Sequence, residues 1–185
     1  ENKDLKGVAG ALNNIGYVIE HQGNSEEALK YYFESLKIEK AINNQPEIAS
    51  RLNNIAAVYQ NQGILEKALE YHYKSIKISE EIGDSEGLGY SYNNLSYIYL
   101  DQKDSAQAFI SLSKGLENFQ AASDILGRAM IYNSIGFAYD KFKDNTDSFE
   151  DCLKSDISFL CLPTPFDEQK NEYDKSCIEE ICQKL

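Results

Sequence analysis

Cysteine and histidine are the side chains best suited to metal binding or nucleophilic catalysis, and this sequence has few of them. The four cysteines, Cys152, Cys161, Cys177 and Cys182, all lie in the last 34 residues. Their spacing contains no CxxC pair and no histidine lies nearby, so a zinc site is not indicated. A disulfide framework normally pins a small secreted fold throughout, whereas the first 151 residues lack cysteine. The cysteines are therefore predicted to be reduced and mostly buried.

The remaining candidates for chemistry are isolated. His21 and His72 are far apart in the sequence, which favours packing or exposed roles over catalysis or metal binding. The run Asp144-Asn145-Thr146-Asp147 resembles the start of a calcium loop but lacks its glycine and closing glutamate. No P-loop, HExxH or Gly-x-Ser-x-Gly motif occurs. We predict no catalytic residues, no cofactor and no metal, and hence a protein that is not an enzyme.

Acidic residues dominate the charge. The net charge is −12, and residues 144–185 contain eleven acidic residues against four lysines. Such a field repels phosphate backbones and anionic lipid, which argues against nucleic acid and membrane surfaces. It suits a basic partner segment, although a solvated acidic end explains it as well. No apolar run is long enough to span a membrane and no apolar signal segment opens the sequence, so a cytoplasmic location is expected.

The elements that position these residues follow a repeat of 40 residues. Residues 12–16 read Leu-Asn-Asn-Ile-Gly, and closely similar strings begin at residues 52, 92 and 132. An ungapped comparison of residues 11–43 with 51–83 gives 15 identities in 33 positions. A fixed period of this length is typical of repeat proteins whose units stack side by side. Four units are predicted, at residues 4–43, 44–83, 84–123 and 124–163, the last of them degenerate.

Each unit is predicted to contain two helices, because apolar residues recur at helical spacing. In the first helix of the first unit, Leu12, Ile15, Val18 and Ile19 are expected to pack. A turn follows at Gly23, and at Gly63 in the second unit, since glycine readily adopts the left-handed conformation that ends a helix. Lysine replaces this glycine in the later units, at Lys103 and Lys143. The residues that open the units are expected to be N-caps: Asp4, Asn44, Asp84 and Asp124.

The repeat resembles the tetratricopeptide repeat family. The family pattern is met by Leu52-Asn53-Asn54-Ile55-Ala56, Tyr59, Gly63, Ala68 and the Tyr71–Tyr73 cluster. The long period resembles the subclass of kinesin light chains, Gα-binding polarity adaptors and bacterial or protist signalling proteins. The resemblance implies an all-α solenoid coiled as a right-handed superhelix, with the first helices lining its concave face. Residues 164–185 fit a C-terminal capping helix with one apolar face: Phe166, Tyr173, Cys177, Ile178, Ile181, Cys182 and Leu185.

Projection of the first helices at 100° per residue identifies the side chains expected to face the groove. An asparagine occupies equivalent positions of all four units, and mostly aromatic residues follow it four positions later. Carboxamides offer both a donor and an acceptor to an extended peptide backbone. The same amides could instead bond between adjacent helices and order the stack. The candidate groove residues are Asn13, Tyr17, Glu20, Ser50, Asn53, Ala57, Gln60, Tyr90, Asn93, Tyr97, Leu100, Met130, Asn133, Phe137 and Asp140.

The function expected from these features is a non-catalytic scaffold that binds an extended or helical segment of a partner protein in this groove. Capture of a terminal carboxylate, as in chaperone-binding members of the family, is not expected, because asparagines occupy the positions where lysines and arginines would be needed. Two alternatives stay open. The chain could be a regulatory or sensory module of a larger signalling protein, such as a histidine kinase or nucleotide cyclase, or a structural subunit of a large assembly.

Overall fold

Polar turns at regular intervals divide the chain into helices of similar length. The structure is a computed structural model that describes residues 2–142, 166–167 and 172–173, except for the side chains of residues 2, 3, 139, 140 and 142 and of the four residues beyond 142. Seven helices lie in the first of these ranges: α1 (Asn2–His21), α2 (Ser25–Ala41), α3 (Gln45–Asn61), α4 (Leu65–Ile82), α5 (Ser85–Asp101), α6 (Ser105–Ala121) and α7 (Ile125–Phe142).

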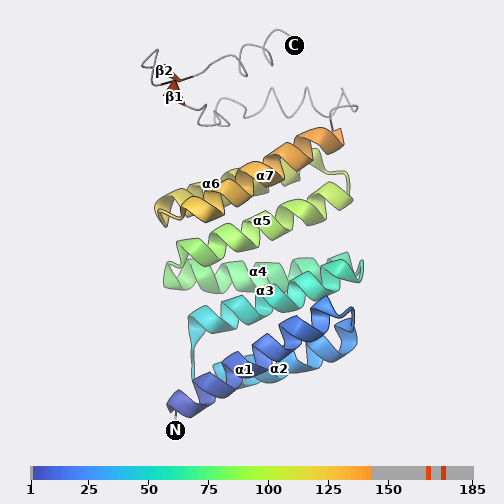
Figure 1. Cartoon of the computed structure of the whole chain (residues 1–185), viewed down its shortest axis with the longest axis vertical. Helices are drawn as coiled ribbons and strands as arrows, with labels where there is room; N and C mark the ends of the chain where they lie inside the picture. The colour runs from blue at the N-terminus through green and yellow to red at the C-terminus, as the bar shows by residue number, and fades with distance from the viewer. Residues whose placement is uncertain (1, 143–165, 168–171, 174–185) are drawn as a thin grey trace.

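These helices form an all-α solenoid. The pairs α1 with α2, α3 with α4, and α5 with α6 are antiparallel hairpins, and each second helix also packs against the first helix of the next hairpin. Figure 1 shows the hairpins following one another along the long axis, from α1 and α2 at one end to α7 near the other. Helix α5 also contacts α3 and α7, so the first helices lie side by side. None of the helices in the described part of the chain is both long and apolar enough to span a lipid bilayer.

Left-handed residues recur every 20 positions and end each helix. Glycine supplies this conformation at Gly23, Gly63 and Gly83, whereas Asn43, Lys103 and Ser123 adopt it with φ between 54° and 61°. The next helix then begins two residues later. The sequence showed that lysine replaces glycine at the turn of Lys103. In the structure the turn is kept, and the lysine adopts the left-handed conformation, which is strained for a residue with a side chain.

Replacing Lys103 with glycine should therefore raise the free energy of unfolding by about 0.5–1 kcal/mol, because glycine has no Cβ to clash at positive φ. Gly63→Ala, at the equivalent turn of the preceding hairpin, should lower it by a similar amount. Urea denaturation followed by circular dichroism measures both. A loss of stability in Lys103→Gly would show that the lysine is not strained.

Helix capping agrees with the sequence in part. The Asp84 carboxylate accepts a hydrogen bond from the Gly87 backbone N–H at 2.9 Å, as predicted. Asp4 is not a cap, because α1 begins at Asn2 and places Asp4 in its first turn. Asn44 does not cap α3 with its side chain. Its Nδ2 donates instead to the buried Glu39 carboxylate at 2.8 Å.

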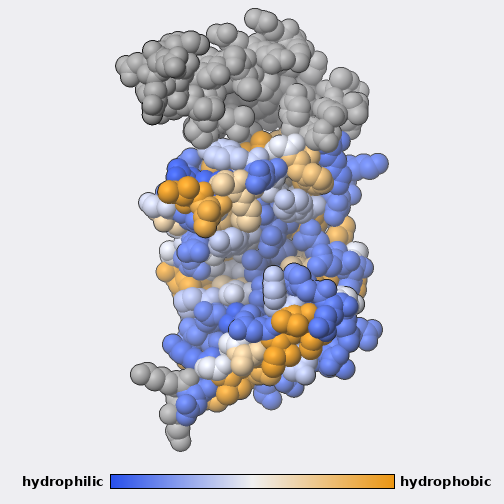
Figure 2. All heavy atoms as spheres, in the orientation of Figure 1, coloured by the Kyte–Doolittle hydropathy of each residue, from blue (hydrophilic) through white to orange (hydrophobic). Residues whose placement is uncertain are grey.

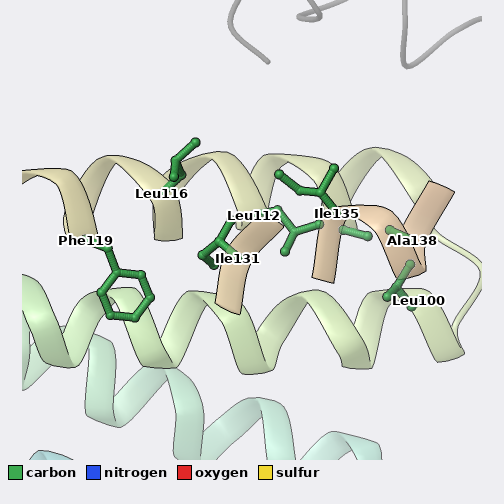
Figure 3. Packing of buried hydrophobic residues seen from close by; sticks show 8 residues of the cluster. Leu100, Leu112, Leu116, Phe119, Ile131, Ile135 and Ala138 are labelled. Atoms are coloured by element: carbon green, nitrogen blue, oxygen red, sulfur yellow. The ribbon is translucent and has the colours of Figure 1, made fainter. Parts of the chain in front are cut away.

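The core consists of clusters between consecutive hairpins. The cluster at α5, α6 and α7 comprises Leu100, Ala108, Leu112, Leu116, Phe119, Ile131, Ile135 and Ala138. Figure 3 shows Phe119 extending from the end of α6 toward α5, with Leu112 and Ile131 packed further along the interface. Small residues permit this packing: Ala28, Ala68 and Ala108 are fully buried, and a Cβ on Gly16 would lie 3.0 Å from the Tyr32 ring.

Equivalent positions in successive junctions use different chemistry. Between α2 and α3, Glu39 is buried and lies 3.9 Å from the Arg51 guanidinium, which also bonds Glu47 at 2.7 Å. Arg51 Nε donates to Ser35 Oγ at 2.9 Å, so the buried charges are paired and hydrogen bonded. Position 39 corresponds to Phe119 and position 51 to Ile131 in the junction between α6 and α7. The junction between α6 and α7 is apolar. In each junction the two positions therefore carry matching side chains, two charged ones at positions 39 and 51 and two apolar ones at positions 119 and 131.

One expectation about packing is wrong. Ile15 and Val18 were expected in the core, but their exposed fractions are 43% and 52% because no described residue covers that face of α1.

Residues 164–185 were predicted as a capping helix, and the structure describes only four of them. Strands β1 (Phe166–Asp167) and β2 (Glu172–Tyr173) form a short antiparallel pair there, with Phe166 opposite Tyr173. Pro165 and the aromatic residues favour extended backbone at these positions. The rest of 164–185 and the helix predicted as the second of the fourth repeat lie outside the described residues, as do all four cysteines and Lys143.

Candidate partner-binding surface

The asparagines align on equivalent helices and form a hydrogen-bonded ladder through the stack. Asn54 Nδ2 donates to Asn13 Oδ1 at 2.8 Å, and Asn94 Nδ2 donates to Asn53 Oδ1 at 3.4 Å. In the third step Ser134 Oγ donates to Asn93 Oδ1 at 2.8 Å. Each bond joins residues 41 positions apart, so every first helix is linked to the next. The ladder oxygens therefore order the stack, which is one of the two roles that the sequence left open.

Two residues of the predicted groove are buried. Asn93 has an exposed fraction of 4% because Ser134 of α7 covers its oxygen. Leu100 is fully buried in the cluster with Leu112 and Ile135. The helical projection placed both on the groove side, but it took no account of the neighbouring helix that overlaps the edge of that face. Neither side chain is available for broad contact with a partner.

The aromatic residues four positions after the ladder are more exposed. Tyr17 and Phe137 have exposed fractions of 55% and 51%. Tyr97 is half-buried: its ring lies 6.0 Å from the Phe137 ring, and its hydroxyl lies 2.9 Å from Ser134 Oγ. Ala57 occupies the same position in α3 and is half-buried, so the row of Tyr17, Ala57, Tyr97 and Phe137 contains one small residue.

The other predicted groove residues differ in availability. Glu20 is half-buried and accepts hydrogen bonds from Tyr32 Oη at 2.8 Å and Asn61 Nδ2 at 3.1 Å, so its carboxylate is already engaged. Tyr90 is exposed at its edge and packs its ring against Phe119 at 5.0 Å. The Asp140 side chain lies outside the described part. Of the other predicted groove residues, Ser50 and Asn133 are exposed, and Gln60 and Met130 are half-buried.

Comparison with known proteins identifies the repeat. Family models described as tetratricopeptide repeat match residues 9–42 and 47–121, which together make up more than half of the chain. The chain belongs to the tetratricopeptide repeat family. Repeats of this family generally mediate protein–protein interactions and typically form non-catalytic scaffolds. The narrower placement in a long-period subclass stays a prediction.

One solved structure shows the same fold. The crystal structure of BtubC (BKLC) from P. vanneervenii matches 86% of this chain with a TM-score of 0.62 and 17% sequence identity. The tetratricopeptide chain spans 65% of the length of that protein. No curated protein matches the sequence. At this identity the structural likeness supports the fold alone.

One rung of the tetratricopeptide ladder contains a buried histidine. His72 is fully buried on α4, and its Nδ1 lies 2.6 Å from Asn53 Oδ1. Its Nε2 has no hydrogen-bond partner. Burial lowers the pKa of His72 from 6.5 to about 4, because the apolar surroundings disfavour the imidazolium. The ring is thus neutral at physiological pH and is a packing residue, as predicted, while it also orients the Asn53 amide.

A cleft on the side of the tetratricopeptide stack away from the predicted groove was not predicted from the sequence. It has a volume of about 260 Å³ between α4, α5 and α6, and its lining includes Tyr73, Tyr92, Tyr99, Lys77 and Lys114. The Tyr73 and Tyr99 hydroxyls lie 2.6 Å apart, and burial followed by this contact raises the pKa of Tyr99 to about 12. Tyr99 therefore stays protonated at neutral pH.

A small residue lines the cleft where the preceding repeat has a large ring. Ser111 lines it, whereas the equivalent residue of the preceding repeat is Tyr71. Tyr71 stacks on Tyr59 at 5.6 Å and meets the edge of Phe33 at 6.1 Å. A comparison of equivalent positions in the repeats could have identified this cleft. Among the side chains that the structure describes, no group of three or more His, Cys, Asp or Glu residues could hold a metal ion.

Proposed function

We propose that this chain is a scaffold that binds an extended segment of a partner protein along the first helices α1, α3, α5 and α7. The observation that supports it most strongly is the row of Tyr17, Ala57, Tyr97 and Phe137, in which large aromatic rings are exposed beside a column of amides. Aromatic side chains that keep half their surface in water without closing a core are common anchors of protein interfaces.

The ladder contributes hydrogen-bond donors to the proposed contact. Its oxygens are engaged between helices, but among the described residues the Asn53 Nδ2 group makes no hydrogen bond. Asn133 is exposed and also free of hydrogen bonds in this part of the chain. Such groups suit the carbonyl oxygens of an extended backbone, which need donors when they leave water. They hold a chain of any sequence in place.

Selectivity then comes from the aromatic row. Ala57 lies between Tyr17 and Tyr97 in this row, so the surface at α3 lacks the side-chain bulk that flanks it. An apolar side chain of the partner can fill this position and bury its surface against the two rings. The net charge of −12 favours a partner segment that is neutral or basic.

Peptides selected from a random display library for binding to the whole chain provide the probe. Tyr17→Ala and Phe137→Ala should each weaken binding about tenfold, because truncation of an interface anchor costs about 1.4 kcal/mol or more. Both rings are half exposed, so neither change should unfold the protein. Isothermal titration calorimetry measures the affinity, and circular dichroism checks the fold.

Two controls test the opposite side of the stack. Phe33→Ala removes an exposed aromatic ring from α2, and Ser111→Tyr places a large side chain in the cleft. Both variants should bind the peptides as the native chain does. Full affinity in Tyr17→Ala and Phe137→Ala, together with a loss in Ser111→Tyr, would move the binding site to the cleft and refute the proposal.

A further inference from the structure

Helix α1 has an apolar face that no described residue covers. Val8, Ile15 and Val18 have exposed fractions of 48%, 43% and 52%. Leu5, also exposed, and Leu12, half-buried, lie on the same helix at compatible spacing. In Figure 2 a continuous band of hydrophobic surface follows α1 across the end of the stack. The end of a repeat stack normally has a polar outer face, so this surface differs from that of a terminal repeat.

The repeat register shows what this face is built to contact. Val8, Leu12, Ile15 and Val18 correspond to Ile48, Leu52, Ile55 and Val58, which are buried to 4% exposure or less in the cluster with α2. The corresponding residues Leu95 and Ile98 of α5 are buried with α4, and Ile135 and Ala138 of α7 lie in the cluster with α6. In every such junction the covering element is the second helix of a hairpin.

Small residues on α1 support the same assignment. A Cβ on Gly127 would lie 2.3 Å from the Phe119 ring of α6. One on Gly87 would lie 2.2 Å from the Asp84 carboxylate and 3.0 Å from Ser79 Oγ of α4. Both glycines thus leave room for the preceding second helix, and Gly87 also leaves room for its N-cap. Gly7 occupies the same register on α1, yet nothing lies within 4 Å of its Cβ position. A glycine inside a helix costs about 1 kcal/mol relative to alanine, so its presence suits a close neighbour.

We propose that this face of α1 is a docking surface for the second helix of one further hairpin of the same repeat, continuous with α1 and stacked ahead of it. The fitting helix has alanine, then a large ring or leucine, then leucine or isoleucine at intervals of four, as in Ala28, Tyr32 and Leu36. A second copy of the chain does not offer this within residues 2–142, because α2, α4 and α6 are already covered by α3, α5 and α7.

An extended chain tests the proposal. A copy of residues 44–83 is placed directly before Asp4, in the register that joins residue 83 to Asp84 in the protein. This hairpin is chosen because its second helix, α4, already packs against a glycine of the same register, Gly87. Circular dichroism should show added helix, and hydrogen exchange should show the α1 amides more strongly protected than in the 185-residue chain.

The same substitution is then compared in both chains. Ile15→Glu should raise the equilibrium constant for unfolding only about twofold in the 185-residue chain, as for a surface change. In the extended chain it should raise this constant at least about 30-fold, because the charge would be buried. Ile110→Glu, on the exposed face of α6, is the matched control and should have the same small effect in both chains.

Three results would overturn the proposal. The added hairpin could fail to protect α1, or Ile15→Glu could have equal effects in the two chains. The third result is a dimer of the 185-residue chain in sedimentation velocity that Ile15→Glu dissociates, which would identify a second copy as the occupant. None of these results bears on peptide binding along the first helices, so the two proposals fail separately.

Discussion

Truncating Phe119 to alanine should lower the free energy of unfolding by about 3–5 kcal/mol, the range for a fully buried phenylalanine. Phe119 is 0% exposed and lies edge-on to Tyr90 at 5.0 Å. Its ring occupies the space that two glycines leave open, since a Cβ on Gly89 would lie 2.6 Å from it and one on Gly127 2.3 Å. Chemical denaturation monitored by circular dichroism measures the change.

A double-mutant cycle shows whether the Phe119 ring fills the space left open at Gly89. Gly89→Ala should destabilise the native chain by about 1–3 kcal/mol through overpacking. The same change in a Phe119→Ala background should be neutral or stabilising, because the clash is gone and alanine favours the helix. Phe33→Ala, at a half-exposed aromatic, serves as the size-matched control with a loss near 1 kcal/mol. Additive effects of Gly89→Ala and Phe119→Ala would contradict the packing described for this junction.

Acid should weaken the fold through His72, by about 3 kcal/mol in total. The pKa of His72 is about 4 in the folded chain, against 6.5 for an unperturbed histidine. As the pH falls, the unfolded chain therefore takes up a proton at this histidine before the folded chain does. The contribution of the neutral ring to the free energy of unfolding is complete above pH 6.5. It is lost progressively as the pH falls from 6.5 through 4, where the buried ring becomes charged. Urea denaturation at a series of pH values measures the loss.

His72→Leu isolates this contribution, because Leu112 occupies the equivalent position of the next repeat and is also fully buried. The variant should show about 3 kcal/mol less pH dependence between pH 6.5 and 4, although carboxylates still titrate in that range. His21→Leu, at an exposed histidine, is the matched control for the substitution itself. Parallel stability curves for the native chain and His72→Leu would show that burial does not suppress the charge on His72.

Much of the architecture follows from the repeat alone. The 40-residue register predicts the hairpins, the turn at Lys103 and the alignment of Asn13, Asn53 and Asn93, because equivalent residues in stacked units must occupy equivalent places. The structure confirms the solenoid, and the family models confirm the family. The described part of the chain contains three complete hairpins and helix α7.

The groove could be predicted only in outline. A helical projection of one helix shows which side chains share a face, but not how much of that face the next helix covers. Asn93 is therefore buried under Ser134, and Leu100 is part of the core rather than the surface. The same limit explains Ile15 and Val18, which are exposed because no described residue covers that face of α1.

Pairs of residues that match across a junction also could not be identified from the sequence. The pair Phe119 and Ile131 occupies the positions of Glu39 and Arg51, but one junction is apolar and the other is charged. Position-by-position comparison of repeats shows that both members change together, but which residues face each other emerges only from the packing. The cleft beside Ser111 is a similar case, because Ser111 lies where the preceding repeat has the Tyr71 ring.

The central claim is that partner segments lie along the first helices, and site-specific photo-crosslinking tests it most directly. Benzoylphenylalanine replaces Tyr17 in one variant and Phe33 in a matched one, so that an exposed aromatic reports from each side of the stack. With a library-selected peptide bound and irradiated, mass spectrometry should find the crosslinked peptide on the Tyr17 variant and little on the Phe33 variant. Crosslinks on the Phe33 variant alone would place the partner on the second helices and contradict the account.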